Sequence, residues 1–179
     1  MNTSPSVSPS SSPSWHSDVY AELRRGNVEF VYTVPDEALA PLLRMADEDP
    51  AMTLVTLSTE EEGVAASCGA WLGNKRAVLM MQSSGVGNCI NAFTLAANCR
   101  FPLLLFVAMR GEFAEVNPWQ SAMGRMTEDC LKLAGFDVWW ARSPSEVAEL
   151  VAGGIRMAWR ADKAVAVLFS QRLVGAKDL

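Results

Sequence analysis

The sequence contains few of the residues from which most catalytic and metal sites are built. There is one histidine, His16, in 179 residues, and the four cysteines form no C-x-x-C pair. A Ser-His-Asp or Cys-His arrangement needs a histidine as its general base, and His16 lies beside a Ser/Pro-rich N-terminus. We therefore expect neither such an arrangement nor a metal site in this chain. Cys68, Cys89, Cys99 and Cys130 lie in apolar or helical contexts, which predicts reduced and mostly buried thiols.

The sequence also lacks a net positive charge and long apolar runs. The net charge is −5, which argues against a nucleic-acid partner because phosphate binding needs a basic face. The longest apolar run, 102–109, is much shorter than a membrane span, so no membrane partner is expected. Residues 1–14 have no basic start and no apolar core, so we expect a disordered Ser/Pro-rich tail and not a secretory signal. These features predict a cytoplasmic protein with one domain over 15–179.

Apolar, β-rich segments alternate with helical ones along the rest of the chain. We expect helices at 19–25, 36–46, 60–73, 88–98, 128–134 and 143–161, a tight turn at 83–88 and an irregular stretch at 109–125. We expect strands at 28–34, 53–57, 77–81, 103–108, 136–140 and 164–169. Near-continuous Val/Leu/Ala strands are typical of a parallel sheet covered on both faces. The sequence therefore predicts an α/β fold with three layers, α/β/α, around a six-stranded parallel sheet.

Three consecutive glutamates, Glu60, Glu61 and Glu62, follow the expected strand 53–57. Ligands of open α/β sheets bind at the carboxyl ends of the strands. The helix dipole favours acids in a first turn, and Ser58 or Thr59 could complete a capping box, so capping explains one or two of the acids. It does not explain three acids followed by a helix of small residues, which lets another backbone or a cofactor approach closely. The run indicates a ligand-facing carboxylate, with capping alone as the alternative.

A glycine-rich segment, Gln82 to Asn88, follows the next expected strand. Glycines allow a sharp turn there, and free amides at a helix N-terminus attract anions or polar ligand atoms. The dinucleotide fingerprint is broken, because Ile90 occupies the third glycine position, and no Walker lysine follows. A ligand-facing turn and a merely structural turn both remain open.

Two arginines and a glutamine fall in the stretch that follows the strand 103–108: Arg110, Gln120 and Arg125. A guanidinium group at the ligand edge suits bidentate binding of a carboxylate, sulfonate or phosphonate. A solvated arginine is the commoner explanation for either residue taken singly.

Together these segments resemble the pyrimidine-binding (PYR) domain of thiamine diphosphate enzymes. The likeness is to the α subunit of sulfopyruvate decarboxylases and to the matching half of phosphonopyruvate decarboxylases. The segments that carry it run in family order at 34–36, 59–64, 81–88, 110–112 and 123–128. The resemblance implies the thiamine diphosphate-binding fold and a catalytic glutamate nine positions before Gly69, which is Glu60. It also implies cofactor contacts at Glu60, Pro35, Ser84, Gly85 and Asn88, and substrate contacts at Arg110, Gln120 and Arg125.

The resemblance further implies how the activity is divided between chains. The family holds the diphosphate and Mg²⁺ through a Gly-Asp-Gly motif, which does not occur in this sequence. We therefore expect a separate β subunit that carries this motif. The thiamine diphosphate cofactor would be accompanied by Mg²⁺, which would be bound mainly by that partner chain. The implied reaction is decarboxylation of a small anionic 2-oxo acid, first sulfopyruvate to sulfoacetaldehyde and CO₂, with phosphonopyruvate as the second choice. A carboligase subunit and a non-catalytic nucleotide-binding module are the alternatives.

Overall fold

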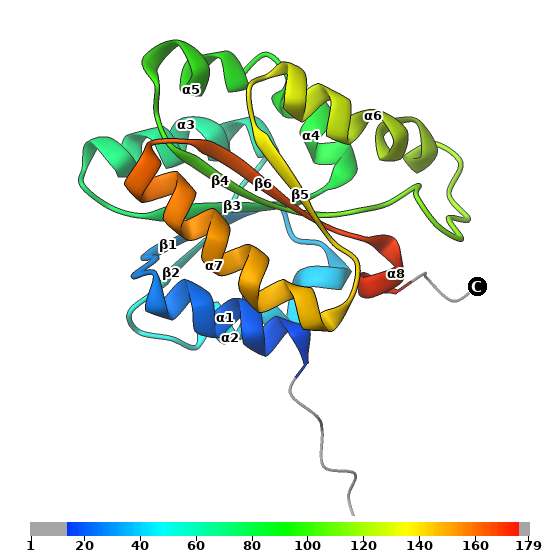
Figure 1. Ribbon diagram of the computed structural model, residues 1–179, viewed down its shortest axis with the longest axis horizontal. Helices are drawn as coiled ribbons and strands as arrows, with labels where there is room; N and C mark the ends of the chain where they lie inside the picture. Colours follow the sequence, from blue (N-terminus) through cyan, green and yellow to red (C-terminus); the bar gives the residue numbers. More distant parts are fainter. Residues whose placement is uncertain (1–13, 176–179) are drawn as a thin grey trace, which may run out of the picture.

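A computed structural model describes residues 14–175, so residues 1–13 of the expected tail lie outside the described part of the chain. The fold is built on one sheet of six parallel strands in the order β2-β1-β3-β4-β6-β5 (Figure 1). The strands are β1 (Phe30–Thr33), β2 (Thr53–Thr56), β3 (Ala77–Gln82), β4 (Leu103–Ala108), β5 (Asp137–Ala141) and β6 (Ala164–Phe169). The predicted six-stranded parallel sheet is confirmed, and each strand lies within two residues of its expected range.

Helices cover both faces of this sheet, which gives the expected three layers (Figure 1). One face carries α1 (Trp15–Arg25), the 3₁₀ turn η1 (Glu37–Leu39), α2 (Ala40–Asp47) and α7 (Pro144–Ala161). The other face carries α3 (Glu60–Leu72), α4 (Ser83–Cys89), α5 (Phe93–Cys99) and α6 (Gln120–Leu133). A short helix, α8 (Gln171–Val174), follows β6. Every residue of the central strand β4 is buried, because its two faces pack against the two helical layers.

The strand order creates a topological switch point at the carboxyl ends of β1 and β3. From β1 the chain passes to α2 on one face, whereas from β3 it passes to α4 on the other face. Because β1 and β3 are neighbours, the connections diverge at their carboxyl ends. Such a divergence is the usual ligand position in an open α/β sheet.

Two local predictions were wrong. The expected turn at 83–88 is the helix α4, and a separate helix α5 follows it at Phe93. Helix α6 begins at Gln120, so Gln120 and Arg125 lie on a helix and not in an irregular loop. In both segments glycine lowers helix propensity, but close tertiary contacts that only glycine permits favour the helix.

The N-terminal helix also starts earlier than expected. It begins at Trp15, so His16 lies within α1, and its Nε2 atom is 2.8 Å from the carbonyl oxygen of Ala38. This corrects the view of His16 as part of the least ordered region. The residue lies on the α1/α2/α7 face, and its recorded hydrogen bond is to Ala38 and not to any of the predicted site residues. Within residues 14–175 no helix is long and apolar enough to cross a membrane.

Candidate active site

Glu60 is the first residue of α3, directly after the loop that follows β2. Its side chain is buried with 6% exposure, whereas Glu61 and Glu62 are exposed. The Glu62 carboxylate accepts a hydrogen bond from the backbone N–H of Ser58 at 2.9 Å, so this acid serves the helix start. Thr59 is the N-cap but makes no side-chain capping bond. The capping alternative therefore accounts for Glu62 and leaves the buried Glu60 without a capping role.

Helix α4 forms the wall against which the Glu60 carboxylate lies. Asn88 donates a hydrogen bond from Nδ2 to Glu60 Oε2 at 2.8 Å. A Cβ atom at Gly85 would lie 2.5 Å from Glu60 Oε1, so any larger residue there would displace the carboxylate. Two of the predicted cofactor residues, Gly85 and Asn88, are thus in direct contact with Glu60. Ser84, on the same helix, is half-buried, and Pro35 is exposed two residues past the end of β1.

Helices α3 and α4 pack closely against the sheet. At Gly63 a Cβ atom would come within 2.4 Å of Leu79 on β3, so this glycine lets α3 lie directly on the sheet. Burial, together with the nearby charges of Glu60 and Glu61, raises the pKa of the Cys89 thiol to about 12. Burial also raises the pKa of Cys68 to about 11. Both thiols therefore stay protonated at neutral pH. All four cysteines are free, but only Cys68 and Cys89 are buried, whereas Cys130 is half-buried and Cys99 is exposed.

Arg110 follows β4 and is buried, with its guanidinium group engaged within its own loop. It donates from Nε to Glu115 Oε2 at 3.0 Å and from Nη2 to Glu115 Oε1 at 3.3 Å. The side chains of both partners are almost fully buried. The hydrogen bond from Arg110 is the largest cause that lowers the pKa of Glu115 to about 2. The pairing partner is Glu115, which the sequence interpretation did not single out.

Residues after β6 hold the same loop from the other side. Gln171 accepts hydrogen bonds at Oε1 from the backbone N–H groups of Glu112 and Phe113 and donates from Nε2 to Glu115. The carboxylate of Glu112 accepts from the Ser170 hydroxyl and from the backbone N–H of Gln171. The loop is therefore held to the segment after β6 by hydrogen bonds of the chain itself. Ser170 and Gln171 were missed, and no local pattern marks them, because their partners lie far away in the sequence.

Gly111 and Gly124 bring this loop against the start of α6. Gly111 has φ +73°, and a Cβ atom on it would lie 2.3 Å from the carbonyl oxygen of Gln120. A Cβ atom on Gly124 would lie 2.2 Å from the carbonyl oxygen of Arg110. The two motifs around these glycines, far apart in sequence, thus meet backbone to backbone. Gly87 of α4 lies against the side chain of Met123 on α6, with 3.1 Å from its ideal Cβ to the sulfur.

The remaining predicted substrate residues lie on α6. Gln120 donates from Nε2 to Gln82 Oε1 at 3.2 Å, at the carboxyl end of β3. The Oε1 atom of Gln120 is buried and has no hydrogen-bond partner among residues 14–175. Arg125 is exposed. Ser83 connects helix α4 with the loop that follows β4. It is the first residue of α4, and its hydroxyl oxygen accepts a hydrogen bond from the backbone N–H of Arg110 at 3.0 Å.

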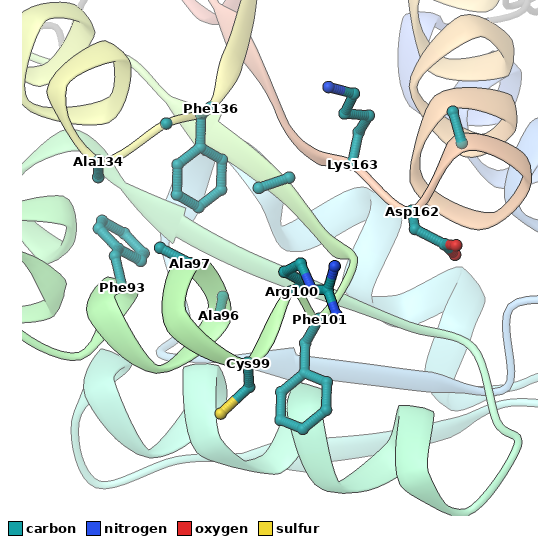
Figure 2. A pocket seen from close by; sticks show the side chains of 13 residues that line it. Phe93, Ala96, Ala97, Cys99, Arg100, Phe101, Ala134, Phe136, Asp162 and Lys163 are labelled. Atoms are coloured by element: carbon teal, nitrogen blue, oxygen red, sulfur yellow. The ribbon is translucent and has the colours of Figure 1, made fainter.

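A cavity lies at the opposite edge of the sheet. Figure 2 shows this cavity, of about 650 Å³, with Phe93 and Phe136 in edge-to-face contact on one side and Arg100, Asp162 and Lys163 around it. It is formed by the loops that precede β4, β5 and β6, and none of the predicted site residues lines it. Among residues 14–175 no cluster of His, Cys, Asp and Glu could hold a metal ion.

Comparison with known proteins agrees with this geometry. Residues 16–127 match the family described as thiamine pyrophosphate enzyme, N-terminal TPP binding domain. The sulfopyruvate decarboxylase subunit alpha of Methanothermobacter thermautotrophicus is 35% identical over 84% of this chain and 92% of that one. The same subunit of Methanocaldococcus jannaschii is 32% identical over 84% of this chain and 90% of that one.

Two further matches are to parts of longer proteins. The phosphonopyruvate decarboxylase of Streptomyces viridochromogenes is 36% identical over 74% of this chain but only 34% of that protein. A solved structure of 2-oxoglutarate:ferredoxin oxidoreductase from Magnetococcus marinus matches 90% of this chain and 29% of that chain, with a TM-score of 0.69 and 14% identity, which shows the shared fold. The chain belongs to the thiamine pyrophosphate enzymes and, within them, to the family of the sulfopyruvate decarboxylase α subunits.

Proposed function

We propose that this chain is the pyrimidine-binding half of a two-chain, thiamine diphosphate-dependent sulfopyruvate decarboxylase that releases sulfoacetaldehyde and CO₂. The observation that carries the proposal is the buried carboxylate of Glu60, which accepts a hydrogen bond from Asn88 and lies against Gly85 beyond the carboxyl ends of the strands. The matched relatives support the substrate, because those that the chain covers almost completely are named sulfopyruvate decarboxylase subunit alpha.

The residues around Glu60 fit the aminopyrimidine ring of the cofactor. Asn88 engages Oε2, and Oε1 has no hydrogen-bond partner among residues 14–175, so one carboxyl oxygen is left for a ring nitrogen. Gly85 keeps the space beside Oε1 free of a side chain. Ser84 and Pro35 would contact the same ring from α4 and from the end of β1. When bound, thiamine diphosphate supplies the electron sink that loss of CO₂ from a 2-oxo acid requires.

Glu60 would hold and move a proton at Oε1. As a carboxylic acid it would hold this proton in a hydrogen bond to ring nitrogen N1′, which would favour the imino tautomer, whose exocyclic nitrogen can act as a base. Burial keeps water from competing for the hydrogen bond, and in a low dielectric the bond is stronger than in water. The bond from Asn88 to Oε2 fixes the orientation of the carboxyl group. Neither Glu61 nor Glu62 can do this, because both are exposed.

The metal and the diphosphate would be held by a partner chain. The absence of Gly-Asp-Gly from the sequence supports this division. We propose a β subunit that carries this motif, binds Mg²⁺ and covers the Glu60 site. We also propose that the assembly works in the cytoplasm, in keeping with the four free cysteines.

Arg125 is the better placed of the two arginines to bind the sulfonate. Its side chain is exposed and makes no hydrogen bond or ion pair within residues 14–175. The fork of Arg110 is already occupied by Glu115, so Arg110 can bind a substrate anion only by giving up that pair. Gln120, with a buried and unpartnered Oε1, would face a donor group of the substrate or cofactor.

The reaction is tested by product analysis with the reconstituted enzyme. The chain and its partner are mixed with thiamine diphosphate and Mg²⁺ and given sulfopyruvate, phosphonopyruvate or pyruvate, each with and without an acceptor aldehyde. We expect the highest kcat/KM with sulfopyruvate and free sulfoacetaldehyde as the product. Phosphonopyruvate is the second candidate substrate, because the Streptomyces viridochromogenes relative is named phosphonopyruvate decarboxylase. A higher kcat/KM with phosphonopyruvate would reassign the substrate. Accumulation of a coupled product only when aldehyde is present would reassign the chain as a carboligase subunit.

A further inference from the structure

Four arginines line one small groove at the edge of the sheet opposite Glu60. The groove, of about 230 Å³, lies between the C-terminal ends of α1 and α7. Its cationic residues are Arg25, Arg76, Arg156 and Arg160, and its only acid is Glu22. We call this feature the arginine groove. The groove is thus lined by four of the 15 basic residues of the chain and by one of its 20 acidic residues. Its charge is therefore opposite in sign to the net charge of the whole chain, which is −5.

The four guanidinium groups differ in how they are engaged. Arg25 forms an ion pair with Glu22. Arg76 donates to the carbonyl oxygen of Gly26 at 2.6 Å and lies 5.4 Å from the ring centre of Trp159, so it is held in place without a carboxylate partner. Arg156 and Arg160 make no hydrogen bond or ion pair with any other residue of 14–175. Three of the four positive charges therefore lack a carboxylate in the described part of the chain.

Helix dipoles account for only part of this cluster. Arg25 and Arg160 lie in the last turns of α1 and α7, where the dipole favours cations. Arg76 precedes β3 and lies on no helix, and Arg156 is one turn further from the end of α7. Helix ends alone would not gather these two residues around the same groove. Like charges placed close together also repel unless an anion separates them.

We propose that the arginine groove binds a multiply charged oxyanion of the phosphate class, either free or as the phosphate group of a small metabolite. Planar guanidinium forks bind phosphate oxygens in pairs, and Arg76 is already oriented by Gly26 and Trp159. The groove is large enough for a phosphate group. Gly26 and Ile155 also line it and pack closely, since an ideal Cβ on the glycine would lie 2.9 Å from the isoleucine side chain. The site does not depend on the proposed decarboxylase activity.

Isothermal titration of the full-length chain in phosphate-free buffer at low salt tests this proposal. The probes are inorganic phosphate, pyrophosphate and a ribonucleoside 5′-monophosphate. We expect saturable binding, and we expect Arg156→Gln and Arg160→Gln each to weaken it about 10- to 100-fold, since a hydrogen bond to a charged group contributes about 1.5–3 kcal/mol. Both side chains are exposed, so neither change should alter the melting temperature. A monophosphate that binds more tightly than inorganic phosphate identifies a phosphate ester as the ligand, and equal affinity identifies the free ion.

The matched control is Arg142→Gln. Arg142 lies just before α7, with its guanidinium 4.8 Å from the ring centre of Trp140 and away from the groove. We expect this variant to bind as the unmodified chain does. An equal loss in Arg142→Gln would show that general charge attraction, and not the groove, binds the anion. No saturable binding, or loss of β-subunit assembly in Arg156→Gln and Arg160→Gln, would overturn the proposal, the second by showing that the groove is a protein interface.

Discussion

Glu60, Glu61 and Glu62 have the same side chain but different surroundings. One is buried against α4, one is exposed, and one accepts the backbone N–H of Ser58. Residue type alone therefore cannot separate their functions, whereas burial and hydrogen-bond partners do. The resemblance to thiamine diphosphate enzymes pointed to Glu60 by its spacing from Gly69, and the structure places that same residue next to Gly85 and Asn88.

Glu60→Gln should keep the fold and the assembly but lower kcat by about 10²- to 10⁴-fold, because an amide cannot pass a proton to N1′. Glu61→Gln is the matched control and should leave kcat nearly unchanged, since its side chain is exposed. Steady-state CO₂ release by the reconstituted enzyme measures both. A larger loss in Glu61→Gln would mean that the catalytic position is one residue further along α3.

Arg125→Met should raise KM for sulfopyruvate by about one to two decades and change KM for pyruvate much less, because only sulfopyruvate carries the sulfonate. Arg110→Met should act differently, by lowering the free energy of unfolding by about 3–5 kcal/mol, since it leaves Glu115 buried without its partner. Kinetics with both substrates, together with urea unfolding, separate the two effects. An unchanged substrate preference in Arg125→Met would place the sulfonate site on the β subunit.

The Arg110–Glu115 pair should also make stability depend on acid. Because the folded-state pKa of Glu115 is lowered from 4.5 to about 2, its ionised form stabilises the fold above about pH 4.5, and this contribution is lost as the pH falls toward 2. Glu115→Gln should be less stable than the unmodified chain at pH 7, and the difference should shrink between pH 5 and pH 3. Urea midpoints over this range test the expectation. A constant difference at all pH values would contradict it.

At the scale of elements, sequence interpretation succeeded where the signals are local and failed where tertiary contacts decide the structure. Apolar strands and the Ser143–Glu146 capping box at the start of α7 are local signals, so the strands and that helix could be predicted. Helix α4 could not, because Gly85 and Gly87 disfavour a helix locally. They are glycines because Glu60 and Met123 occupy the space a side chain would need. The start of α6 was missed for the same reason, at Gly124.

Gly85→Ala should therefore damage function more than stability. Its Cβ atom would displace the flexible end of Glu60, and a misplacement of about 1 Å can lower kcat by about 10²-fold. Gly69→Ala is the matched control, since it lies in helix α3 with nothing within 4 Å of an added Cβ. It should raise the free energy of unfolding by about 0.5–1 kcal/mol and keep full activity. Wild-type kcat in Gly85→Ala would show that Glu60 need not lie where the structure places it.

At the scale of the whole molecule, the sheet order gathers residues from four separate segments at one edge. Glu60 follows β2, Gly85 and Asn88 follow β3, Arg110 follows β4 and Gln171 follows β6. The alternation of strands and helices could be predicted from local apolar patterns, whereas the order of the strands could not, because it depends on tertiary contacts between distant segments. The same edge carries the buried carboxylate of Glu60 but, within residues 14–175, no cluster that could hold a metal.

The most direct test of the proposed function is reconstitution of sulfopyruvate decarboxylation from separate chains. CO₂ release is measured for this chain alone, for the β subunit alone and for their mixture, each with thiamine diphosphate and Mg²⁺. The mixture is then repeated with Glu60→Gln in place of the unmodified chain. We predict activity in the unmodified mixture alone, and weak cofactor binding by this chain by itself. Full turnover by this chain without its partner, or undiminished activity of the Glu60→Gln mixture, would contradict the proposed site.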